Sequence, residues 1–311
     1  MGFAPVHAEA PGKVILLGEH AVVYGAMAVG FPLGHAIRVQ LEEGHGHIRL
    51  EADDGVEVPL SGRAASPREL VSRALGKWLP KVDVQIRFGF PPMSGLGSSA
   101  AMAVALLRAR QQLERARKVP FDTSLRAALA TERVAHSKPS GLDPAICLAG
   151  AAIRFHREGS AMHVQRLQPA RTFHFVVGAV GAHGGTRTVV GRVADLKKQS
   201  PQLVRAALVT LGEASKLGAK AINRGETQPL GVAMNLAHGV LAGLGLVSTG
   251  VGAAIQTAKQ AGAIGAKMSG AGGEGGAFLA LYPSRKAAEA ARDELRLGGV
   301  ACWVERIPTA R

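Results

Sequence analysis

Residues 11–25 read PGKVILLGEHAVVYG, and no other stretch of the chain is as informative about what it does. Lys13, Glu19 and His20 follow one another closely, separated by an apolar run and framed by glycines and one proline. Charged side chains are costly to crowd together unless something binds there. The stretch therefore predicts a polar site on a tight loop. Two further glycine-rich stretches, residues 91–100 and 269–276, predict that the site has three parts.

The length and the glycine content point to two domains that share a ligand cleft. The chain has 311 residues, which is long for a single core, and we expect domains at residues 1–170 and 171–311. The 40 glycines are many for a folded chain, and glycine is what a loop needs where its backbone approaches a ligand closely.

The charge balance is strongly basic, with a net charge of +14 from 37 basic and 23 acidic residues. Such a balance suits nucleic acid, an anionic membrane surface or small anions. Aromatic residues are only 4% of the chain, which argues against stacking on nucleic acid, and no apolar run approaches the ~20 residues of a membrane helix. We therefore expect small anionic substrates, no nucleic acid and no membrane, with most helical arginines, such as Arg108, on solvated faces.

The two cysteines, Cys147 and Cys302, lie among apolar neighbours. Buried, reduced thiols are typical of the cytoplasm, and the N-terminus lacks the basic and apolar segments of a signal peptide. We expect a cytoplasmic protein, and the sequence leaves its oligomeric state open, a homodimer included.

The first half of the chain alternates between strand and helix patterns. Period-two alternation predicts strands at 37–43, 48–52, 56–60 and 82–88. A capping pattern at 66–69 predicts a helix to about residue 79, and segments rich in Ala, Leu and Arg predict helices at 98 to about 118 and 122 to about 135.

The second half predicts a strand followed by long helices and a mixed end. The expected elements are a strand at 173–179, helices within 189–261 with breaks near Ser200 and Gly225, strands at 263–268 and 277–282, a helix at 284–297 and a strand at 300–307. This order favours an α+β fold built on a split β-α-β sandwich with additional helices.

Residues 91–100 read PPMSGLGSSA and lie between an expected strand and an expected helix. The N-terminal end of a helix presents unpaired N–H groups and a positive dipole end, which suit a phosphate. Gly95 and Gly97 let the backbone approach phosphate oxygens, and a hydroxyl of Ser98 or Ser99 could reach a metal ion. A strand, this loop and a helix together predict a phosphate-binding site.

A site that binds a phosphate and a metal ion still lacks a carboxylate that holds the metal and a general base. Asp143 follows the turn at Ser140 and Gly141, where a new helix is expected to begin, and Glu132 lies near the end of the preceding helix. Taken alone, Asp143 could be a helix cap and Glu132 part of a solvated face. The glycine-rich loops favour a chemical role for both.

With these motifs in place, the chain resembles the GHMP kinases, the superfamily of galactokinase, homoserine kinase, mevalonate kinase and phosphomevalonate kinase. GEHAVVYG at residues 18–25, PSGLD at 139–143 and TRTVVGRV at 186–193 are most similar to the mevalonate kinase subgroup. The resemblance extends from about residue 8 to residue 281. It implies an N-terminal domain like ribosomal protein S5 domain 2, a ferredoxin-like C-terminal domain with extra helices, and phosphoryl transfer from ATP with Mg²⁺.

The resemblance also implies a role for each matching residue. Asp143 corresponds to the base, and Lys13 to the lysine beside it. Ser99 and Glu132 correspond to the Mg²⁺ ligands. Substrate contacts fall on Lys13, Glu19, His20, Asp143 and Thr186. The nucleotide loop falls on Pro92, Met93, Ser94, Gly95, Leu96, Gly97, Ser98, Ser99 and Ala100.

The third loop departs from the family pattern. Residues 269–276 read SGAGGEGG, with Ser269 where the family usually has threonine and Glu274 among the glycines. A carboxylate near phosphates must point away from them or pair with a cation.

Three interpretations of the function stay open: a kinase for mevalonate or another small acceptor, a non-catalytic ATP-binding relative, and a basic nucleic-acid-binding protein.

The remaining histidines carry less information. His45 and His47 could share a metal on one face of a strand, although an exposed turn explains them as well. His136, His156 and His183 have no partners that the sequence identifies.

Overall fold

The structure is a computed structural model that describes residues 3–53, 55–56, 58, 67–116, 119–134, 139–181 and 186–310, with only the backbone of residues 186–188 and 190. Its chain forms two compact units. The first comprises Met1–Lys13, Pro32–Pro92 and Gly97–Gly150, and the second comprises Val14–Phe31, Met93–Leu96 and Ala151–Arg311. Strands β1 (Val6–Leu17) and β2 (Ala28–Glu43) each have residues in both units.

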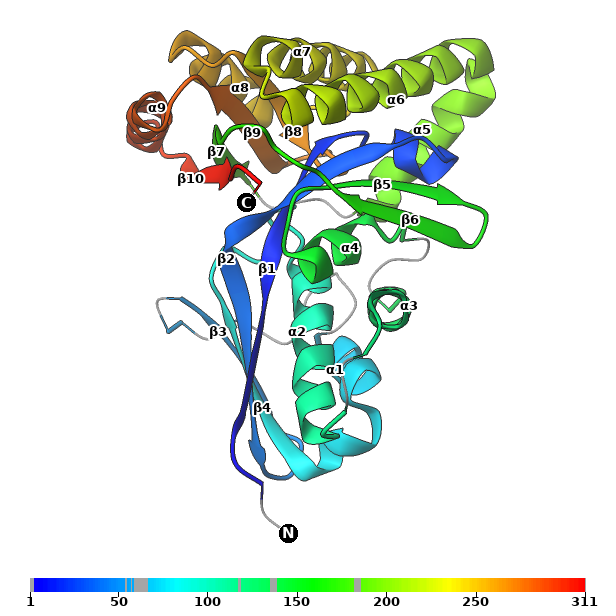
Figure 1. Ribbon diagram of the computed structural model, residues 1–311, viewed down its shortest axis with the longest axis vertical. Helices are drawn as coiled ribbons and strands as arrows, with labels where there is room; N and C mark the ends of the chain where they lie inside the picture. Colours follow the sequence, from blue (N-terminus) through cyan, green and yellow to red (C-terminus); the bar gives the residue numbers. More distant parts are fainter. Residues whose placement is uncertain are drawn as a thin grey trace. The chain divides into compact units, whose positions relative to one another are not determined.

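The first unit packs helices against one face of a sheet (Figure 1). Strand β3 (Ile48–Ala52) pairs in parallel with β4 (Val82–Phe88), β4 pairs antiparallel with β2, and β1 also pairs with β2. The helices are α1 (Pro67–Leu75), the 3₁₀ helix η2 (Gly76–Lys81), α2 (Ser98–Leu113), α3 (Phe121–Glu132) and α4 (Leu142–Ala149). The alternation in β4 buries its apolar residues, and α2 contacts α1, α3 and α4.

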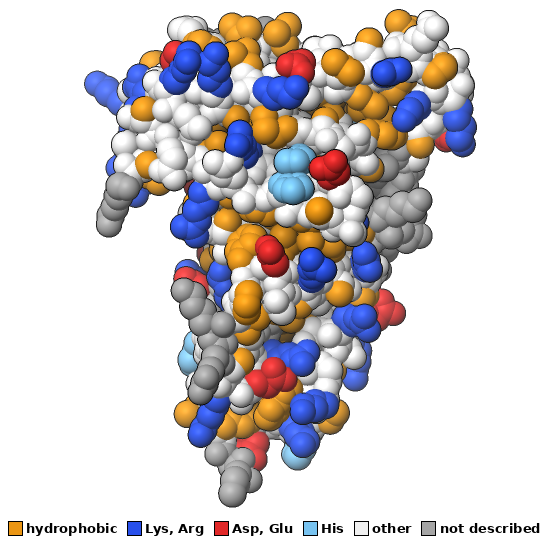
Figure 2. Space-filling model, turned by 45° about the vertical axis from the view of Figure 1, so that its right-hand side comes forward, with side chains coloured by type: hydrophobic (Ala, Val, Ile, Leu, Met, Phe, Trp, Pro, Cys, Tyr) orange, Lys and Arg blue, Asp and Glu red, His pale blue; other side chains and the backbone are white. Residues whose placement is uncertain are grey.

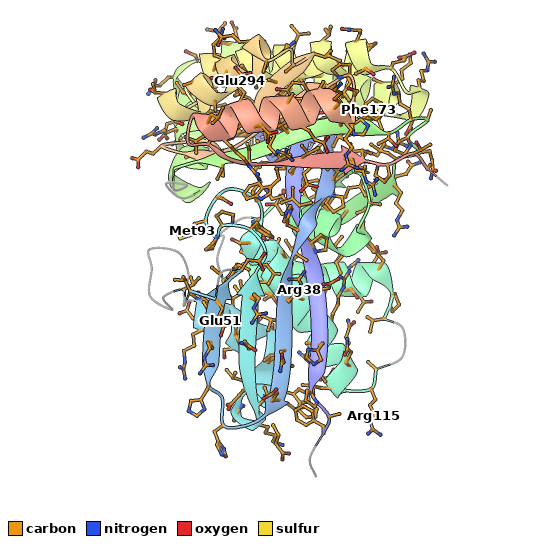
Figure 3. The ribbon with its side chains drawn as sticks, turned by 90° about the vertical axis from the view of Figure 1, so that its left-hand side faces the viewer. Arg38, Glu51, Met93, Arg115, Phe173 and Glu294 are labelled. Carbon is orange, nitrogen blue, oxygen red and sulfur yellow. The ribbon has the colours of Figure 1, made fainter. Side chains whose placement is uncertain are left out.

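The other face of this sheet is polar. Arg38, Arg87 and Glu51 lie on it in neighbouring strands, and Figure 3 shows Arg38 and Glu51 there. Arg87 pairs with Glu51 at 3.2 Å, whereas Arg38 lies 3.6 Å from Glu9. These arginines are therefore already engaged by carboxylates of the same unit.

The second unit is built on a four-stranded antiparallel sheet in the order β10–β7–β9–β8. Its strands are β7 (Phe173–Val180), β8 (Gly265–Ser269), β9 (Gly276–Tyr282) and β10 (Ala301–Ile307). Helices α8 (Thr249–Gln260) and α9 (Arg285–Leu297) contact this sheet, and α7 (Thr227–Gly243) contacts β8. Every residue of β8 and β9 is buried, which makes these two strands the centre of the unit.

Further elements complete the second unit. Helix α6 (Pro201–Arg224) packs on α7 and is contacted by α5 (Thr186–Gln199) and by the 3₁₀ helix η1 (Ala21–Tyr24). Strands β5 (Ile153–Glu158) and β6 (Ala161–Arg166) form a hairpin that pairs with the first residues of β2. Among the described residues, no helix combines the length and apolarity that crossing a bilayer would need.

Most of the expected elements are confirmed, with informative exceptions. The strands at 48–52 and 82–88 have the expected bounds, and the long helices break at Ser200 and Gly225. The helix expected to reach residue 79 ends at Leu75 and continues as 3₁₀ helix. Strands β1, β5 and β6 were not expected, and neither was the interruption between α7 and α8. The strand expected at 56–60 falls mostly outside the described residues.

The tight loop expected within residues 11–25 begins later than predicted, because residues 11–17 are the end of β1. Gly12 explains the error. A Cβ on residue 12 would lie 2.7 Å from the ring of Phe90 and 2.8 Å from Leu33. Glycine is present because the strand lies close to these side chains, and it does not mark a turn. The turn begins only after Leu17, at Gly18.

Lysine and arginine side chains are scattered over the face shown in Figure 2 and do not form one stripe. Arg108 of α2 contradicts the solvated face expected for the arginines of this helix. It is partly buried and donates to the backbone oxygen of Glu9 at 2.6 Å. Burial lowers the pKa of Arg108, and its guanidinium therefore has a structural role within the first unit.

Candidate active site

The glycine-rich loop after β4 leads into α2 at Ser98, as expected for a phosphate loop. Its backbone has positive φ at Met93, Gly95 and Gly97. Gly97 is the N-cap of α2 and has no side chain that could cap the first-turn N–H groups. The N-terminus of α2 carries the positive end of the helix dipole, which suits an anion.

Gly97 also determines where Lys13 lies. A Cβ on residue 97 would be 2.5 Å from Cγ and 2.7 Å from Cε of Lys13, so only glycine lets the loop and the lysine lie together. The backbone φ of +80° at this position strengthens the requirement. Lys13 itself is 3% exposed and lies on β1.

Lys13 pairs with Asp143. Its Nζ lies 2.9 Å from Oδ2 of Asp143, the second residue of α4. The turn expected before this helix is confirmed: Gly141 is the N-cap with φ 93°, and the hydroxyl of Ser140 accepts a hydrogen bond from the N–H of Leu142 at 3.2 Å. The Asp143 side chain is 29% exposed, so its carboxylate is held by the lysine and still open on one side.

Glu132 is the last residue of α3 and is 2% exposed, which contradicts the solvated face considered for it. The hydroxyl of Ser99 donates to its Oε1 at 3.4 Å. Burial and the neighbouring negative charge of Asp143 raise the pKa of Glu132 to about 8, while Lys13 and Ser99 oppose the shift. The same causes raise the pKa of the buried Cys147 thiol well above its usual value.

Four of the sequence-predicted residues, Lys13, Ser99, Glu132 and Asp143, are therefore neighbours in the first unit. Two carboxylates and a hydroxyl are hard oxygen donors of the kind that Mg²⁺ prefers. A buried carboxylate that resists ionisation beside a second one is also where a divalent cation would relieve the most unfavourable charge. The residues present fit a magnesium ion held by Ser99 and Glu132.

A second group lies in the other unit and begins with Glu19. Its carboxylate pairs with the Nζ of Lys267, a residue of β8, and both side chains are almost completely buried. Burial lowers the pKa of Lys267, and Glu19 opposes this shift. Lys267 was not identified from the sequence. The available signal was a lone lysine in an apolar strand directly before a glycine-rich loop.

His20 connects the first motif to the third glycine-rich loop. Its Nε2 lies 2.8 Å from the backbone oxygen of Ala271, so this nitrogen carries the proton and Nδ1 is an acceptor. Burial lowers the pKa of His20, and the charge of Lys267 lowers it further. The ring is thus neutral near pH 7. His20 also has a left-handed backbone, with φ 61°, which is unusual for a residue other than glycine.

The third loop is held by Ser269, whose hydroxyl donates to the backbone oxygen of Ile15 and accepts from the N–H of the same residue. The hydroxyl that replaces the family's threonine therefore joins β8 to β1. Glu274 is exposed, and its orientation relative to bound phosphates stays a prediction.

Some candidate residues lie elsewhere. Thr186 is the first residue of α5, but its side chain is outside the described part of the structure, as are His136 and His183. His45 and His47 are exposed and donate their backbone N–H groups to Asp83, in agreement with a turn.

A cavity of about 910 Å³ in the first unit is lined by Arg38, Arg87 and Arg108, among others, and not by Lys13, Ser99, Glu132 or Asp143. Arg38, Arg87 and Arg108 make the internal contacts described above. We therefore place the site at the lysine–aspartate pair and not in this cavity.

Sequence comparison agrees with this geometry. Residues 63–151 match the GHMP kinases N terminal domain, and residues 219–301 match the GHMP kinases C terminal domain. The chain belongs to the GHMP kinase family, and its two-sheet α+β fold is the fold expected from the sequence.

Within this family it is most similar to mevalonate kinases. It is 33% identical over 293 residues to the mevalonate kinase of Aeropyrum pernix, covering 88% of each chain. It is also 33% identical over 308 residues to the mevalonate kinase of Pyrococcus horikoshii, covering 90% of each. The crystal structure of L. major mevalonate kinase in complex with R-mevalonate superposes with a TM-score of 0.84 at 26% identity, covering 98% of this chain and 97% of that one.

Proposed function

We propose that this protein is an ATP-dependent mevalonate kinase, which phosphorylates the primary hydroxyl of mevalonate to give 5-phosphomevalonate for isoprenoid precursor synthesis. The observation that carries the proposal is the 2.9 Å contact between Lys13 and Asp143, because it provides a base and a cation in one pair. The similarity to mevalonate kinases over about nine-tenths of the chain supports the choice of acceptor.

The proposed mechanism uses Asp143 as the general base. Its partly exposed carboxylate accepts the proton of the mevalonate hydroxyl, which becomes the nucleophile toward the γ-phosphorus of ATP. The ammonium of Lys13 would lie beside the oxygen that loses the proton and stabilise the charge that develops there. Phosphoryl transfer depends mostly on positioning and charge stabilisation, so a fixed lysine–aspartate pair is suited to it.

The nucleotide is proposed to bind along residues 92–100. The first-turn N–H groups of α2 would donate to its phosphate oxygens. Ser99 and Glu132 would hold Mg²⁺, which when bound neutralises part of the triphosphate charge. A cation binds the ionised form of Glu132. Because the pKa of Glu132 is raised, ionisation of this carboxylate is favoured when the cation is bound.

The acceptor is proposed to contact His20, Glu19 and Thr186 in addition to the catalytic pair. Neutral His20 would accept a hydrogen bond at Nδ1, because its Nε2 is occupied by Ala271. Glu19 is held by Lys267, so its proposed contact with the acceptor rests on the family resemblance.

The decisive test of the acceptor is an assay of ADP release with Mg²⁺-ATP and a panel of mevalonate, phosphomevalonate, galactose and homoserine. We expect kcat/KM to be highest for mevalonate and the product to carry its phosphate on the primary hydroxyl. A higher kcat/KM for another acceptor would keep the family assignment and overturn the substrate. No turnover with any of them would favour the non-catalytic alternative.

The metal assignment has its own test in the same assay. Glu132→Gln and Ser99→Ala should raise the Mg²⁺ concentration for half-maximal rate, by about 10-fold or more for Glu132→Gln, because an amide is a poorer ligand than a carboxylate. Asp122→Asn is the matched control, since Asp122 is an exposed carboxylate in the first turn of the same helix. Unchanged Mg²⁺ titrations in both site variants would exclude the assignment.

A further inference from the structure

The β5–β6 hairpin carries a cluster that phosphoryl transfer does not use. His156 and His163 lie directly opposite each other in the strand register, and Glu158 lies two residues from His156 on the same face of β5. The ligand atoms of the three side chains all lie within 4.8 Å of one another. Among the described residues, this is the one group of three such side chains brought together in this way.

The hairpin fixes these positions firmly. Ile153 and Phe155 bury the opposite face of β5, so the alternation of the strand turns His156 and Glu158 outward. A two-residue turn, Gly159 and Ser160, joins the strands and sets the register. Residues on one face of paired strands cannot separate without breaking that register.

The two imidazole rings are stacked, with centroids 4.4 Å apart and an angle of 9° between their planes. In Figure 2 two adjacent histidines, coloured pale blue, stand beside an acidic side chain on the exposed surface. Within the hairpin, Arg154 donates to Gln165, and Arg157 donates to the backbone oxygen of Gly159.

We propose that His156, Glu158 and His163 bind a divalent first-row transition metal ion such as Zn²⁺, Co²⁺ or Ni²⁺, with water in the remaining positions. Imidazole nitrogens with a single carboxylate suit these ions, whereas Mg²⁺ prefers oxygen. Two ligand atoms at about 2.1 Å from one metal are at most about 4.2 Å apart. To bind one ion, the two rings must turn out of their stack so that their nitrogens converge, which exposed side chains can do.

The bound ion would connect the two strands of the hairpin near the turn that joins them. Its effect is therefore local, because a ligand that binds only the paired strands stabilises their pairing. The cluster shares no residue with the active-site groups, so its occupation and the kinase activity are separate properties of the protein.

The experiment is a calorimetric titration of the full chain with Zn²⁺. The buffer contains an excess of Mg²⁺, which saturates sites made only of oxygen ligands. We expect one site that His156→Ala and His163→Ala weaken at least about 10-fold. Glu158→Gln should weaken it as well, with little change in side-chain size. His47→Ala, which removes another exposed histidine beside a carboxylate, should leave the affinity unchanged.

Hydrogen exchange provides the local readout. Zn²⁺ should slow exchange of the amides of β5 and β6 in the parent protein and not in His163→Ala. Kinase turnover without added zinc should be the same in both. Equal Zn²⁺ affinity in the parent and in His163→Ala, or no measurable binding to the parent, would overturn the proposal, and so would binding without slower exchange in the hairpin.

Discussion

Each unit contains a lysine paired with a carboxylate, and the two pairs are exposed to different degrees. In the first unit, Lys13 and Asp143 have side-chain exposures of 4% and 29%. In the second, Lys267 and Glu19 have exposures of 0% and 1%. A general base must lie within reach of its substrate. The enclosed pair, by contrast, should affect the stability of its unit most when it is broken. The chemistry of the two pairs is the same, and access separates their roles.

The largest effect is expected when the enclosed pair is broken. Lys267→Met or Glu19→Gln alone should lower the free energy of unfolding by about 3–5 kcal/mol, because each leaves a buried charge without its counterion. The double variant should recover most of this loss. Chemical unfolding of the three variants, analysed as a double-mutant cycle, measures the coupling.

A surface pair in the same unit serves as the control. Lys198 and Asp195 lie 3.0 Å apart with side-chain exposures of 79% and 66%. Lys198→Met should change stability little, since water screens exposed ion pairs. Single variants at Lys267 and Glu19 that are as stable as the parent would remove the distinction between the enclosed pair and a surface pair.

Changing the open pair should affect catalysis more than stability. Asp143→Asn keeps the size of the side chain and removes the proton acceptor, so kcat should fall by at least about 100-fold, with the KM for ATP little changed. Its loss of thermal stability should be smaller than that of Lys267→Met, because the Asp143 side chain is already partly in water. A kcat close to that of the parent would show that Asp143 is not the base.

A smaller effect is expected at His238, whose pKa the charge of Lys267 helps to lower. Burial lowers the pKa of His238 on α7 to about 4, with Lys259 and Lys267 adding to the shift. The folded protein thus keeps His238 neutral, whereas the unfolded chain takes up a proton below about pH 6.5. The stability that depends on His238 is complete above pH 6.5 and is lost as the pH falls toward 4.

His238→Gln should therefore reduce the dependence of unfolding free energy on pH between about 6.5 and 4. His238 is partly exposed, so the change will be modest. Urea unfolding of the variant and the parent at several pH values in this window measures it, with the exposed His47→Gln as the control. Parallel pH curves for His238→Gln and the parent would contradict the effect.

The smallest effect is expected at Glu274, an exposed carboxylate with no role in either pair. Glu274→Gly restores the family's usual glycine-rich loop and should leave kcat and the KM for ATP within a few-fold of the parent values. A collapse of kcat with the fold intact would give Glu274 a catalytic or metal-binding role.

The sequence predicted the elements whose signal is local. The β4 alternation and the turn before Asp143 depend on neighbouring residues, and both are confirmed. The β5–β6 hairpin had such a signal as well, in the alternation on both sides of Gly159 and Ser160, but it was not recognised. The domain boundary expected between residues 170 and 171 stays a prediction.

The sequence could not predict features that depend on distant residues. Lys267 pairs with a carboxylate 248 positions earlier in the chain, and the apolar strand around it, the one local signal, does not identify that partner. Taken alone, Glu132 could have been part of a solvated face, and its burial depends on the packing of its unit, which no neighbouring residue indicates. Crowding of Lys13, Glu19 and His20 was read as the sign of a ligand, although Lys13 and Glu19 each have an internal counterion.

The two buried cysteines give each unit a reporter of its own opening. Cys147 belongs to the first unit and Cys302 to the second, and burial raises the pKa of both thiols. The thiolate is the reactive form, and a buried thiol with a raised pKa rarely forms it. A thiol reagent can therefore modify either cysteine only when the surrounding structure opens. Labelling rates followed separately at the two cysteines would therefore measure how often each unit opens within the same molecule, without any added probe.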